Sequence, residues 1–222
     1  METSCDGNPV VPFMMNRQDL LRRVSDYYTA RIAEYGPVPR GVDWNSAESQ
    51  QMRFEQLLRL CDSGKHFSIN DYGCGYGVLP RFLDARGAEF TYVGFDISPV
   101  MIAHARRALA AMPNCSVVEK LEQLRVADYT IASGIFNVKL DTGEEEWTAY
   151  ILDTLDRMRE LSARGFGFNM LTGHCDRNLM RPDLYYADPG FYVRHCLGRF
   201  SRRLSLLHDY PLYEFTILVW LK

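Results

Sequence analysis

The sequence predicts an α/β protein built on a doubly wound, mostly parallel sheet, and three observations lead to this prediction. Apolar, strand-like segments alternate with amphipathic helical segments along most of the chain. Glycines alternate at Gly73, Gly75 and Gly77, directly after the first of these strands. The next strand, residues 90–95, ends at an acidic residue, Asp96. Strand, glycine loop, helix, strand and acid in this order describe a βαβ unit that holds a nucleoside, with the acid on the ribose hydroxyls.

The glycine loop also distinguishes between nucleoside ligands. Residues 66–69 form its strand-like approach, and Asp71 lies just before the first glycine. A nicotinamide or flavin fingerprint, G-x-G-x-x-G, would need its third glycine where this chain has Val78. A carboxylate beside the loop would repel a pyrophosphate, but it suits a ligand that carries an ammonium group. The pattern favours S-adenosylmethionine, which has a ribose and no phosphate; the alternative is a glycine-rich surface turn beside a buried strand.

Two segments carry a family resemblance. Residues 71–77 (D-Y-G-C-G-Y-G) and 94–98 (G-F-D-I-S) resemble the first two motifs of the class I S-adenosylmethionine-dependent methyltransferases. The resemblance covers about residues 17–222, although only these two motifs are specific. It implies a Rossmann-like, seven-stranded sheet whose last strand is antiparallel, with an N-terminal helical cap. The cofactor contacts that it implies around the two motifs are Asp71, Gly73, Cys74, Gly75, Asp96, Ile97 and Ser98.

Length and composition indicate one domain. The chain has 222 residues, of which 47% are hydrophobic, enough for one sizeable core. A net charge of −3 provides no general attraction to nucleic acid or to acidic membranes. We find no signal-peptide pattern and no apolar run of roughly 18 residues, so we expect a cytoplasmic protein without membrane contact. Six scattered cysteines without a C-x-x-C pair favour reduced thiols over disulfides or a metal site. Monomer and homodimer both stay open.

The chain begins with an expected flexible lead, residues 1–16, followed by a single methyltransferase domain, residues 17–222. Within that domain, residues 17–62 are expected to form the helical cap and residues 63–222 the Rossmann-like core. Apolar residues recur three and four positions apart over residues 17–35, which predicts an amphipathic helix. A second helix is expected to begin after Ser46, its N-cap.

The first helix carries Tyr28, Arg31 and Tyr35 on one face. In the resembled family, a helix of this kind folds over the methionine end of the cofactor. Tyr28 and Arg31 are therefore expected to contact the cofactor, with the guanidinium on its carboxylate, and Tyr35 to face the substrate. The alternative is a surface arginine lying over two core tyrosines. Trp44, in the loop after this helix, is either a packing plug or an aromatic wall of the substrate pocket.

Further strands are expected at residues 115–118, 129–133 and 165–171, with helices at 99–111 and 144–161. Ligands of a doubly wound sheet bind beyond the carboxyl ends of its strands. Ser133 and Gly134 should then face the sulfonium, and Phe136 the acceptor. The resemblance places the adenine contact at residues 119–121, so Leu121 is expected to contact the cofactor. The family's usual Asp is missing there, and Glu119 or Glu122 is its candidate substitute. Asn137 either orients the substrate or hydrogen-bonds the loop backbone.

The loop over residues 172–189 is the expected substrate lid. It carries His174, the candidate general base, and Tyr185 and Tyr186, candidate lining residues. A solvated loop histidine and a packed tyrosine pair are the alternatives. A short helix near 189–200 and two strands, 203–208 and 215–221, close the chain.

These features favour a methyltransferase that uses S-adenosyl-L-methionine and acts on the oxygen or nitrogen of a small molecule. A role in secondary-metabolite or glycan biosynthesis fits the moderate size and the aromatic cap and lid. Residues 133–136 lack the [N/D]-P-P-[Y/F] motif of methyltransferases that modify nucleobase amino groups or glutamine. A methyltransferase of protein or RNA, a non-catalytic S-adenosylmethionine-binding protein and a nucleotide oxidoreductase are the alternatives.

Overall fold

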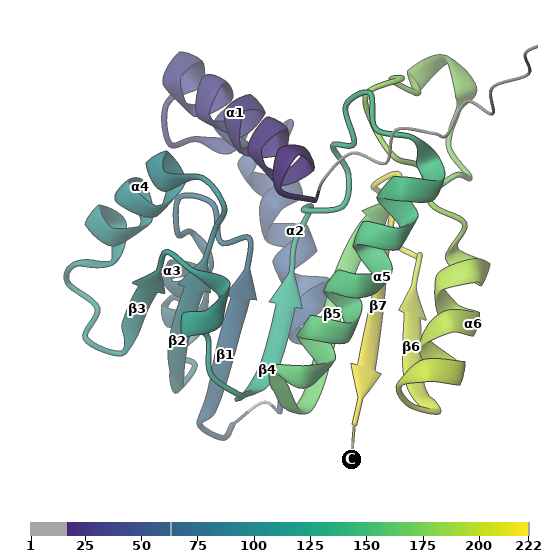
Figure 1. Ribbon diagram of the computed structural model, residues 1–222. Helices are drawn as coiled ribbons and strands as arrows, with labels where there is room; N and C mark the ends of the chain where they lie inside the picture. The colour runs from purple at the N-terminus through teal and green to yellow at the C-terminus, as the bar shows by residue number, and fades with distance from the viewer. Residues whose placement is uncertain (1–16, 63, 222) are drawn as a thin grey trace, which may run out of the picture.

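A computed structural model describes residues 17–62 and 64–221 of the chain. Their core is a seven-stranded sheet in the order β3-β2-β1-β4-β5-β7-β6 (Figure 1). The first five strands are parallel, and β7 runs antiparallel to both β5 and β6. The predicted fold class, a mostly parallel sheet of seven strands with an antiparallel last strand, is confirmed. The lead expected over residues 1–16 lies outside the described residues.

The elements follow the order expected from the sequence. The strands are β1 (Phe67–Tyr72), β2 (Phe90–Phe95), β3 (Cys115–Val118), β4 (Ala127–Ala132), β5 (Ser162–Leu171), β6 (Arg203–Leu207) and β7 (Glu214–Trp220). The α-helices are α1 (Arg17–Tyr35), α2 (Ala47–Leu58), α3 (Leu79–Asp84), α4 (Pro99–Leu109), α5 (Glu144–Glu160) and α6 (Pro189–Arg199). Three 3-10 turns are η1 (Pro39–Val42), η2 (Leu121–Gln123) and η3 (Arg177–Leu179).

Two strands are longer than expected, and both extensions have a pairing reason. In β1 the strand continues through Asp71 and Tyr72, which pair with Gly94 and Phe95 of β2 in parallel register. In β5 the strand already begins at Ser162, because the first residue of β4 pairs with it across a register shift. Asp71 is therefore the second-last residue of β1 and does not belong to the glycine loop.

Helices cover both faces of the sheet. On one face, α5, α6 and the N-terminal half of α1 pack against β4, β5 and β7, around residues such as Trp147 and Phe168. On the other face, α2, α3 and α4 pack around residues such as Leu57 and Ile69. Strand side chains alternate between the two cores because the side-chain period of a strand is two. Among the described helices, none is long and apolar enough to cross a membrane.

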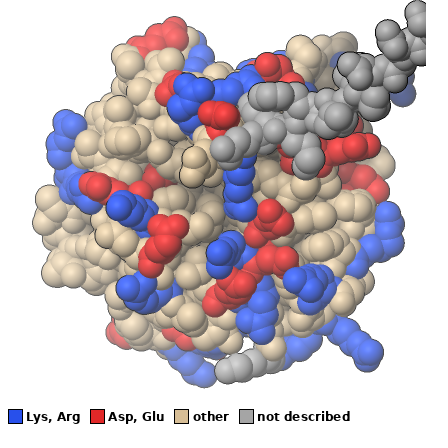
Figure 2. All heavy atoms as spheres, viewed as in Figure 1, with Lys and Arg blue, Asp and Glu red and all other residues tan. Residues whose placement is uncertain are grey.

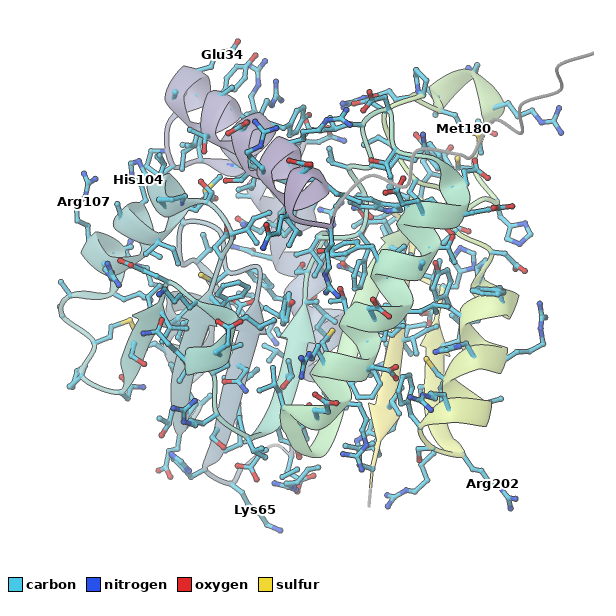
Figure 3. The ribbon with its side chains drawn as sticks, viewed as in Figure 1. Glu34, Lys65, His104, Arg107, Met180 and Arg202 are labelled. Atoms are coloured by element: carbon cyan, nitrogen blue, oxygen red, sulfur yellow. The ribbon has the colours of Figure 1, made fainter. Side chains whose placement is uncertain are left out.

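The cap helix α1 lies across the carboxyl edge of the sheet (Figure 1). Two polar contacts fasten it to the turn after β2: Ser25 Oγ donates to the Ile97 carbonyl at 3.3 Å, and the hydroxyls of Thr29 and Ser98 lie 3.0 Å apart. Figure 3 shows Glu34 at the end of α1 above this edge, while Lys65 points away at the opposite edge. Because strand ends and α1 meet here, this edge is where a ligand of a doubly wound sheet binds.

The second cap helix begins where the sequence places it. Ser46 caps α2: its Oγ accepts a hydrogen bond from the Ser49 backbone N–H at 3.1 Å, and the Ser49 hydroxyl faces the Ser46 N–H at 3.3 Å. These bonds satisfy N–H groups that a helix leaves free at its start. The cap fixes the direction of α2 and therefore the positions of Gln50 and Phe54, one and two turns further along.

Candidate active site

A cavity opens at the carboxyl edge of β1, β2 and β4, beneath α1. It holds about 830 Å³ of empty space, counted out to its open mouth. The structure brings together ten of the residues expected at the site: Tyr28, Trp44, Asp71, Gly73, Cys74, Gly75, Asp96, Ile97, Ser133 and Gly134 all line it.

The glycine loop forms the floor of this cavity and depends on its glycines. Gly73 has a φ of 89° and Gly75 a φ of 54°, in the left-handed region that side chains with a Cβ disfavour. A Cβ on Gly73 would lie 2.2 Å from Cγ2 of Ile135, in the segment after β4. The loops after β1 and β4 therefore approach each other as closely as a bare backbone allows.

Residues of the loop between α1 and α2, residues 36–46, which we term the cap loop, lie directly over this floor. A Cβ on Gly75 would meet Cγ1 of Val42 at 3.5 Å, and one on Gly134 would meet the Trp44 indole at 3.1 Å. Val42 and Trp44 thus stand over the glycines of two different strand ends. The cap loop spans the cavity from one strand end to the other.

Backbone N–H groups orient the carboxylate of Asp96. The Gly75 N–H donates to Oδ2 and the Ser98 N–H donates to Oδ1, each at 2.9 Å. Burial raises the pKa of Asp96 above its usual value, while these backbone hydrogen bonds lower it in part. A carboxylate has further acceptor positions beyond the two used here, so Asp96 can still accept hydrogen bonds from a diol at the cavity wall.

Asp71 is a buried carboxylate without a cationic partner among the described residues. It is 4% exposed, and its only side-chain hydrogen bond among the described residues comes from the Tyr92 hydroxyl, which donates to Oδ2 at 2.9 Å. Burial raises the pKa of Asp71 to about 7; the Tyr92 hydrogen bond lowers it in part, and the nearby Asp96 adds to the rise. A positively charged ligand would supply the missing counter-charge.

The raised pKa of Asp71 has a consequence for stability. Its folded pKa lies above the unfolded value, so the folded chain binds the extra proton between about pH 4 and about pH 7. The contribution of Asp71 to the free energy of unfolding is then lost as the pH rises through about 7. We expect Asp71→Asn to remove this loss and to make the ligand-free protein more stable than the wild type at about pH 8. Urea unfolding across this pH range measures it.

Asp128 is the matched control for that experiment. Burial raises its pKa, but hydrogen bonds from the N–H and hydroxyl of Ser68 outweigh burial and hold it below the usual value. Asp128→Asn should therefore lower stability at neutral pH, the opposite sign. Equal responses of the two variants to pH would contradict the assignment to Asp71.

Several lining residues escape the sequence patterns. They are Val24, Val42, Gln50, Phe54, Tyr72, Tyr76, Val78, Phe95, Met101, Ile135 and Tyr150. Val24 lies one helical turn before Tyr28, and Gln50 lies one turn before Phe54. Helical spacing alone would therefore have predicted that the two members of each pair share a helix face. Tyr150 belongs to the apolar stripe of α5 and carries no local sign of a ligand site. The missed residues are those whose role depends on how the cap packs over the sheet.

Arg31 and Tyr35 do not line the cavity. The Arg31 Nη2 donates to Asp43 Oδ1 at 2.8 Å, and its guanidinium lies 4.6 Å from the centre of the Tyr35 ring. Arg40 lies over the same ring at 4.5 Å. A carboxylate of the protein itself is therefore the partner of Arg31 in this structure, and its contact with a cofactor carboxylate stays a prediction.

Asp43 accepts hydrogen bonds from three side chains on two segments, and we term Asp43 and these three residues, Tyr27, Arg31 and Arg181, the Asp43 cluster. Besides Arg31, the Tyr27 hydroxyl donates to Asp43 Oδ2 at 2.9 Å and the Arg181 Nη1 donates to it at 3.1 Å. Arg181 also pairs with Asp183 in the loop over residues 172–188. Asp43 itself has a left-handed φ of 59°. The cluster joins α1, the cap loop and the 172–188 loop immediately beside Trp44.

The 172–188 loop places its expected site residues away from the cavity. Tyr185 is buried, with its hydroxyl 2.9 Å from Thr148 Oγ1 and 3.0 Å from the Tyr192 hydroxyl. The Tyr186 hydroxyl accepts from the Arg181 N–H at 2.9 Å. His174 is exposed, with its ring 6.3 Å from that of His208. These positions fit the packed tyrosines and the solvated histidine; a lid or base role stays a prediction.

Asn169, which the sequence analysis did not select, contacts the two residues of the cavity wall at the end of β4. Asn169 is fully buried, and its Oδ1 accepts from the Gly134 N–H at 2.7 Å while its Nδ2 faces Ser133 Oγ at 3.5 Å. The signal in the sequence was an asparagine inside an otherwise apolar strand. Asn137, in contrast, uses its Oδ1 to accept from the Leu171 N–H at 3.2 Å, the backbone role weighed for it.

Three other expected residues lie just outside the cavity wall. Phe136 is fully buried, with its ring 5.9 Å from that of Phe168. Ser98 caps α4 by accepting from the Met101 N–H at 3.4 Å. Leu121 is half-buried against the core, and both Glu119 and Glu122 are exposed. Among the described residues, none in the segment between β3 and β4, residues 119–126, lines the cavity, so the adenine contact at this position stays open.

The charges around the cavity define the class of ligand. Two carboxylates, Asp71 and Asp96, line it, and no lysine or arginine belongs to its described wall. A site for a dinucleotide would place positive groups or several free N–H groups on the diphosphate. The glycine loop, the backbone-held carboxylate of Asp96 and the uncompensated carboxylate of Asp71 instead fit a nucleoside that carries positive charge.

Known proteins agree with this class. A family model described as a methyltransferase domain matches residues 69–160. A protein named as a methyltransferase, Rv1506c of Mycobacterium tuberculosis, is 48% identical over 162 residues, which cover 73% of this chain and 98% of the relative. The chain therefore belongs to the class I S-adenosylmethionine-dependent methyltransferases, as its two motifs predicted. Trans-aconitate 2-methyltransferase of Escherichia coli is 38% identical over 84 residues, 35% of this chain and 32% of that relative.

Solved structures share the fold at low identity. Magnesium protoporphyrin IX methyltransferase from Synechocystis PCC 6803, crystallised with S-adenosylhomocysteine, has a TM-score of 0.66 at 16% identity and covers 91% of this chain and 99% of its own. The N-methyltransferase NodS from Bradyrhizobium japonicum, also with S-adenosylhomocysteine, has a TM-score of 0.62 at 16% identity, covering 88% and 96%. These likenesses support the fold and leave the acceptor open.

Proposed function

We propose that the cavity binds S-adenosyl-L-methionine and that the protein transfers a methyl group to the oxygen or nitrogen of a small molecule. The observation that carries the proposal is the pair of lining carboxylates, Asp71 and Asp96, in a wall to which the described part of the chain contributes no lysine or arginine. When bound, the cofactor supplies a methyl group already activated on a positively charged sulfur. A positive ligand without phosphate is the one that this wall favours.

The residues present fit such a cofactor. The bare backbone of Gly73 and Gly75 leaves room that a Cβ would fill, because the Ile135 side chain already occupies the space beside Gly73. Asp96 is held by two backbone N–H groups in a position to accept hydrogen bonds from ribose hydroxyls. Asp71 offers a negative charge toward the ammonium or sulfonium end. Tyr28 and Ile97 supply the apolar walls.

The protein's own contribution is alignment and exclusion of water. Ser133 and Gly134, fixed by the buried Asn169, mark the place where an acceptor would approach along the line of the breaking bond. Holding two reactants at near-attack distance removes roughly 7–11 kcal/mol of barrier. Val42, Trp44 and α1 lie over the cavity and would limit the access of water to bound reactants. A phenol, an amine or a carboxylate would need little further activation.

A small acceptor fits the covered site better than a macromolecule does. The cap loop spans the cavity between Gly75 and Gly134, so a long polymer would have to displace it. Figure 2 shows Lys and Arg interleaved with Asp and Glu over the visible face, without an extended basic patch for RNA. The related structures include an N-methyltransferase and a magnesium protoporphyrin IX methyltransferase, which supports a role in small-molecule biosynthesis.

Calorimetry followed by turnover tests the proposal. We expect S-adenosylmethionine and S-adenosylhomocysteine to bind at one site and NAD to show no binding. Release of S-adenosylhomocysteine is then followed over a panel of phenols, amines and carboxylic acids, with a basic peptide and a short RNA as macromolecular acceptors. Turnover confined to the peptide or RNA would overturn the small-molecule assignment, and NAD binding in place of the sulfonium ligand would overturn the cofactor assignment.

A further inference from the structure

One corner of the cavity presents an N–H donor that the protein leaves unused. Trp44 lines the cavity, and its Nε1 would lie 3.2 Å from a Cβ placed on Gly134. No residue in the described part of the chain accepts a hydrogen bond from this indole N–H. The donor therefore faces the end of β4, on the side where the acceptor is expected.

A second unused donor lies behind the indole. The Arg53 guanidinium sits 4.7 Å from the centre of the Trp44 ring, and Arg53 is only 8% exposed. Its Nε donates to both carboxylate oxygens of Glu214, at 3.0 and 2.8 Å, and its Nη2 also donates to Glu214. Its Nη1 is buried and has no partner. A buried guanidinium N–H left unpaired is unfavourable, so an oxygen that reached it would bind well.

The fold places this arginine on the acceptor side of the cavity. Arg53 belongs to α2, between Gln50 and Phe54, both of which line the cavity. Glu214 begins β7 and pairs with Leu171 at the end of β5. Because β5 lies between β7 and β4 in the sheet, the Arg53–Glu214 pair is at the same edge as Ser133 and Gly134, two strands away.

Resting on the proposed function, we infer that the methyl acceptor carries a carboxylate, which Trp44 Nε1 and Arg53 Nη1 bind. The Trp44 indole covers the Arg53 guanidinium. In this proposal the indole turns aside when the carboxylate enters, and this movement exposes Arg53 Nη1. Glu214 already balances the charge of Arg53, and the corner therefore selects by donor geometry and not by net charge. Asp71 and Asp96, which would repel a carboxylate, lie at the ends of β1 and β2, on the opposite side of β4 from β5 and β7.

Two probes of equal shape test this inference. Protein saturated with S-adenosylhomocysteine is titrated with para-fluorobenzoate and with para-fluorobenzamide, followed by fluorine NMR. We expect the carboxylate to bind about tenfold more tightly than the amide, because hydrogen bonds to a charged acceptor are the stronger ones. Trp44→Phe keeps the ring but removes the N–H. In this variant, and in the double variant Arg53→Met/Glu214→Gln, the preference should fall to about twofold or less.

The double variant avoids leaving the Glu214 carboxylate buried without its partner, which would destabilise the fold. Arg86→Met is the matched control, since Arg86 also pairs with a glutamate, Glu55, and lies 4.3 Å from an aromatic ring, Phe82, but outside the cavity. It should keep the full preference.

Calorimetry of S-adenosylhomocysteine on every variant separates the two claims. Wild-type protein that does not bind it ends the proposed function and the inference together. Normal binding of S-adenosylhomocysteine with no carboxylate preference in the wild type overturns the inference alone. A preference that survives in the double variant, or that Arg86→Met also abolishes, does the same.

Discussion

Replacing Asp96 by alanine should weaken S-adenosylmethionine binding at least about a hundredfold. The carboxylate is the group at the end of β2 that can accept hydrogen bonds from both ribose hydroxyls, and hydrogen bonds to a charged acceptor are worth about 1.5–3 kcal/mol each. Gly75 and Ser98 also lose the acceptor of their N–H groups, which loosens the floor of the cavity. Calorimetric titration of the variant with S-adenosylmethionine measures the change.

Asp128→Ala is the control for this prediction. Its carboxylate also accepts from a backbone N–H, that of Ser68 at 2.9 Å, but Asp128 lies near the start of β4, at the opposite edge from the cavity. Cofactor affinity should stay within about twofold of wild type in this control. An unchanged dissociation constant in Asp96→Ala would reject the ribose role of Asp96.

The second large effect is expected for Gly73→Ala. The residue must adopt a φ of 89°, and its new Cβ would lie 2.2 Å from Ile135 Cγ2. The left-handed backbone costs about 1–2 kcal/mol for a residue with a Cβ, and forced overlap in a packed region adds about 1–3 kcal/mol. We expect a loss of about 2–5 kcal/mol in unfolding free energy, measured by urea unfolding, together with weaker cofactor binding.

Gly87→Ala separates the two contributions. Gly87 has a φ of 67°, and a Cβ there would meet nothing within 4 Å, so only the backbone cost applies. The double variant Gly73→Ala/Ile135→Ala should recover part of the stability lost in Gly73→Ala, because it removes the overlapping methyl group. Equal losses for Gly73→Ala and Gly87→Ala would show that the two loops do not constrain each other.

The nucleoside half of the site was predictable because its signals are local. The glycines, Asp71 and Asp96 follow one another along a short βαβ unit, and their spacing alone implies a shared strand edge. Parallel pairing then brings Asp71 beside Gly94 and fixes the edge in register. The same logic located Ser133 and Gly134 at the end of β4, where they do line the cavity.

The acceptor half depends on tertiary packing, and local patterns do not determine it. The helical face of α1 was predicted, but the partner of Arg31 is Asp43, in a left-handed conformation that its sequence does not announce. Gln50 and Tyr150 line the cavity from helices whose periodicity indicates only core. Asn169 orients Gly134 from a neighbouring strand, a contact between residues far apart in sequence.

The Asp43 cluster also constrains how ligands can pass into and out of the cavity. One carboxylate serves Tyr27 and Arg31 of the cap helix as well as Arg181 of the 172–188 loop. Pulling either segment away leaves that carboxylate with fewer donors and an arginine without its anion, so small independent excursions are disfavoured. The cap helix and the 172–188 loop should therefore move away from the cavity together. One cofactor molecule should then leave and the next enter during the same opening event.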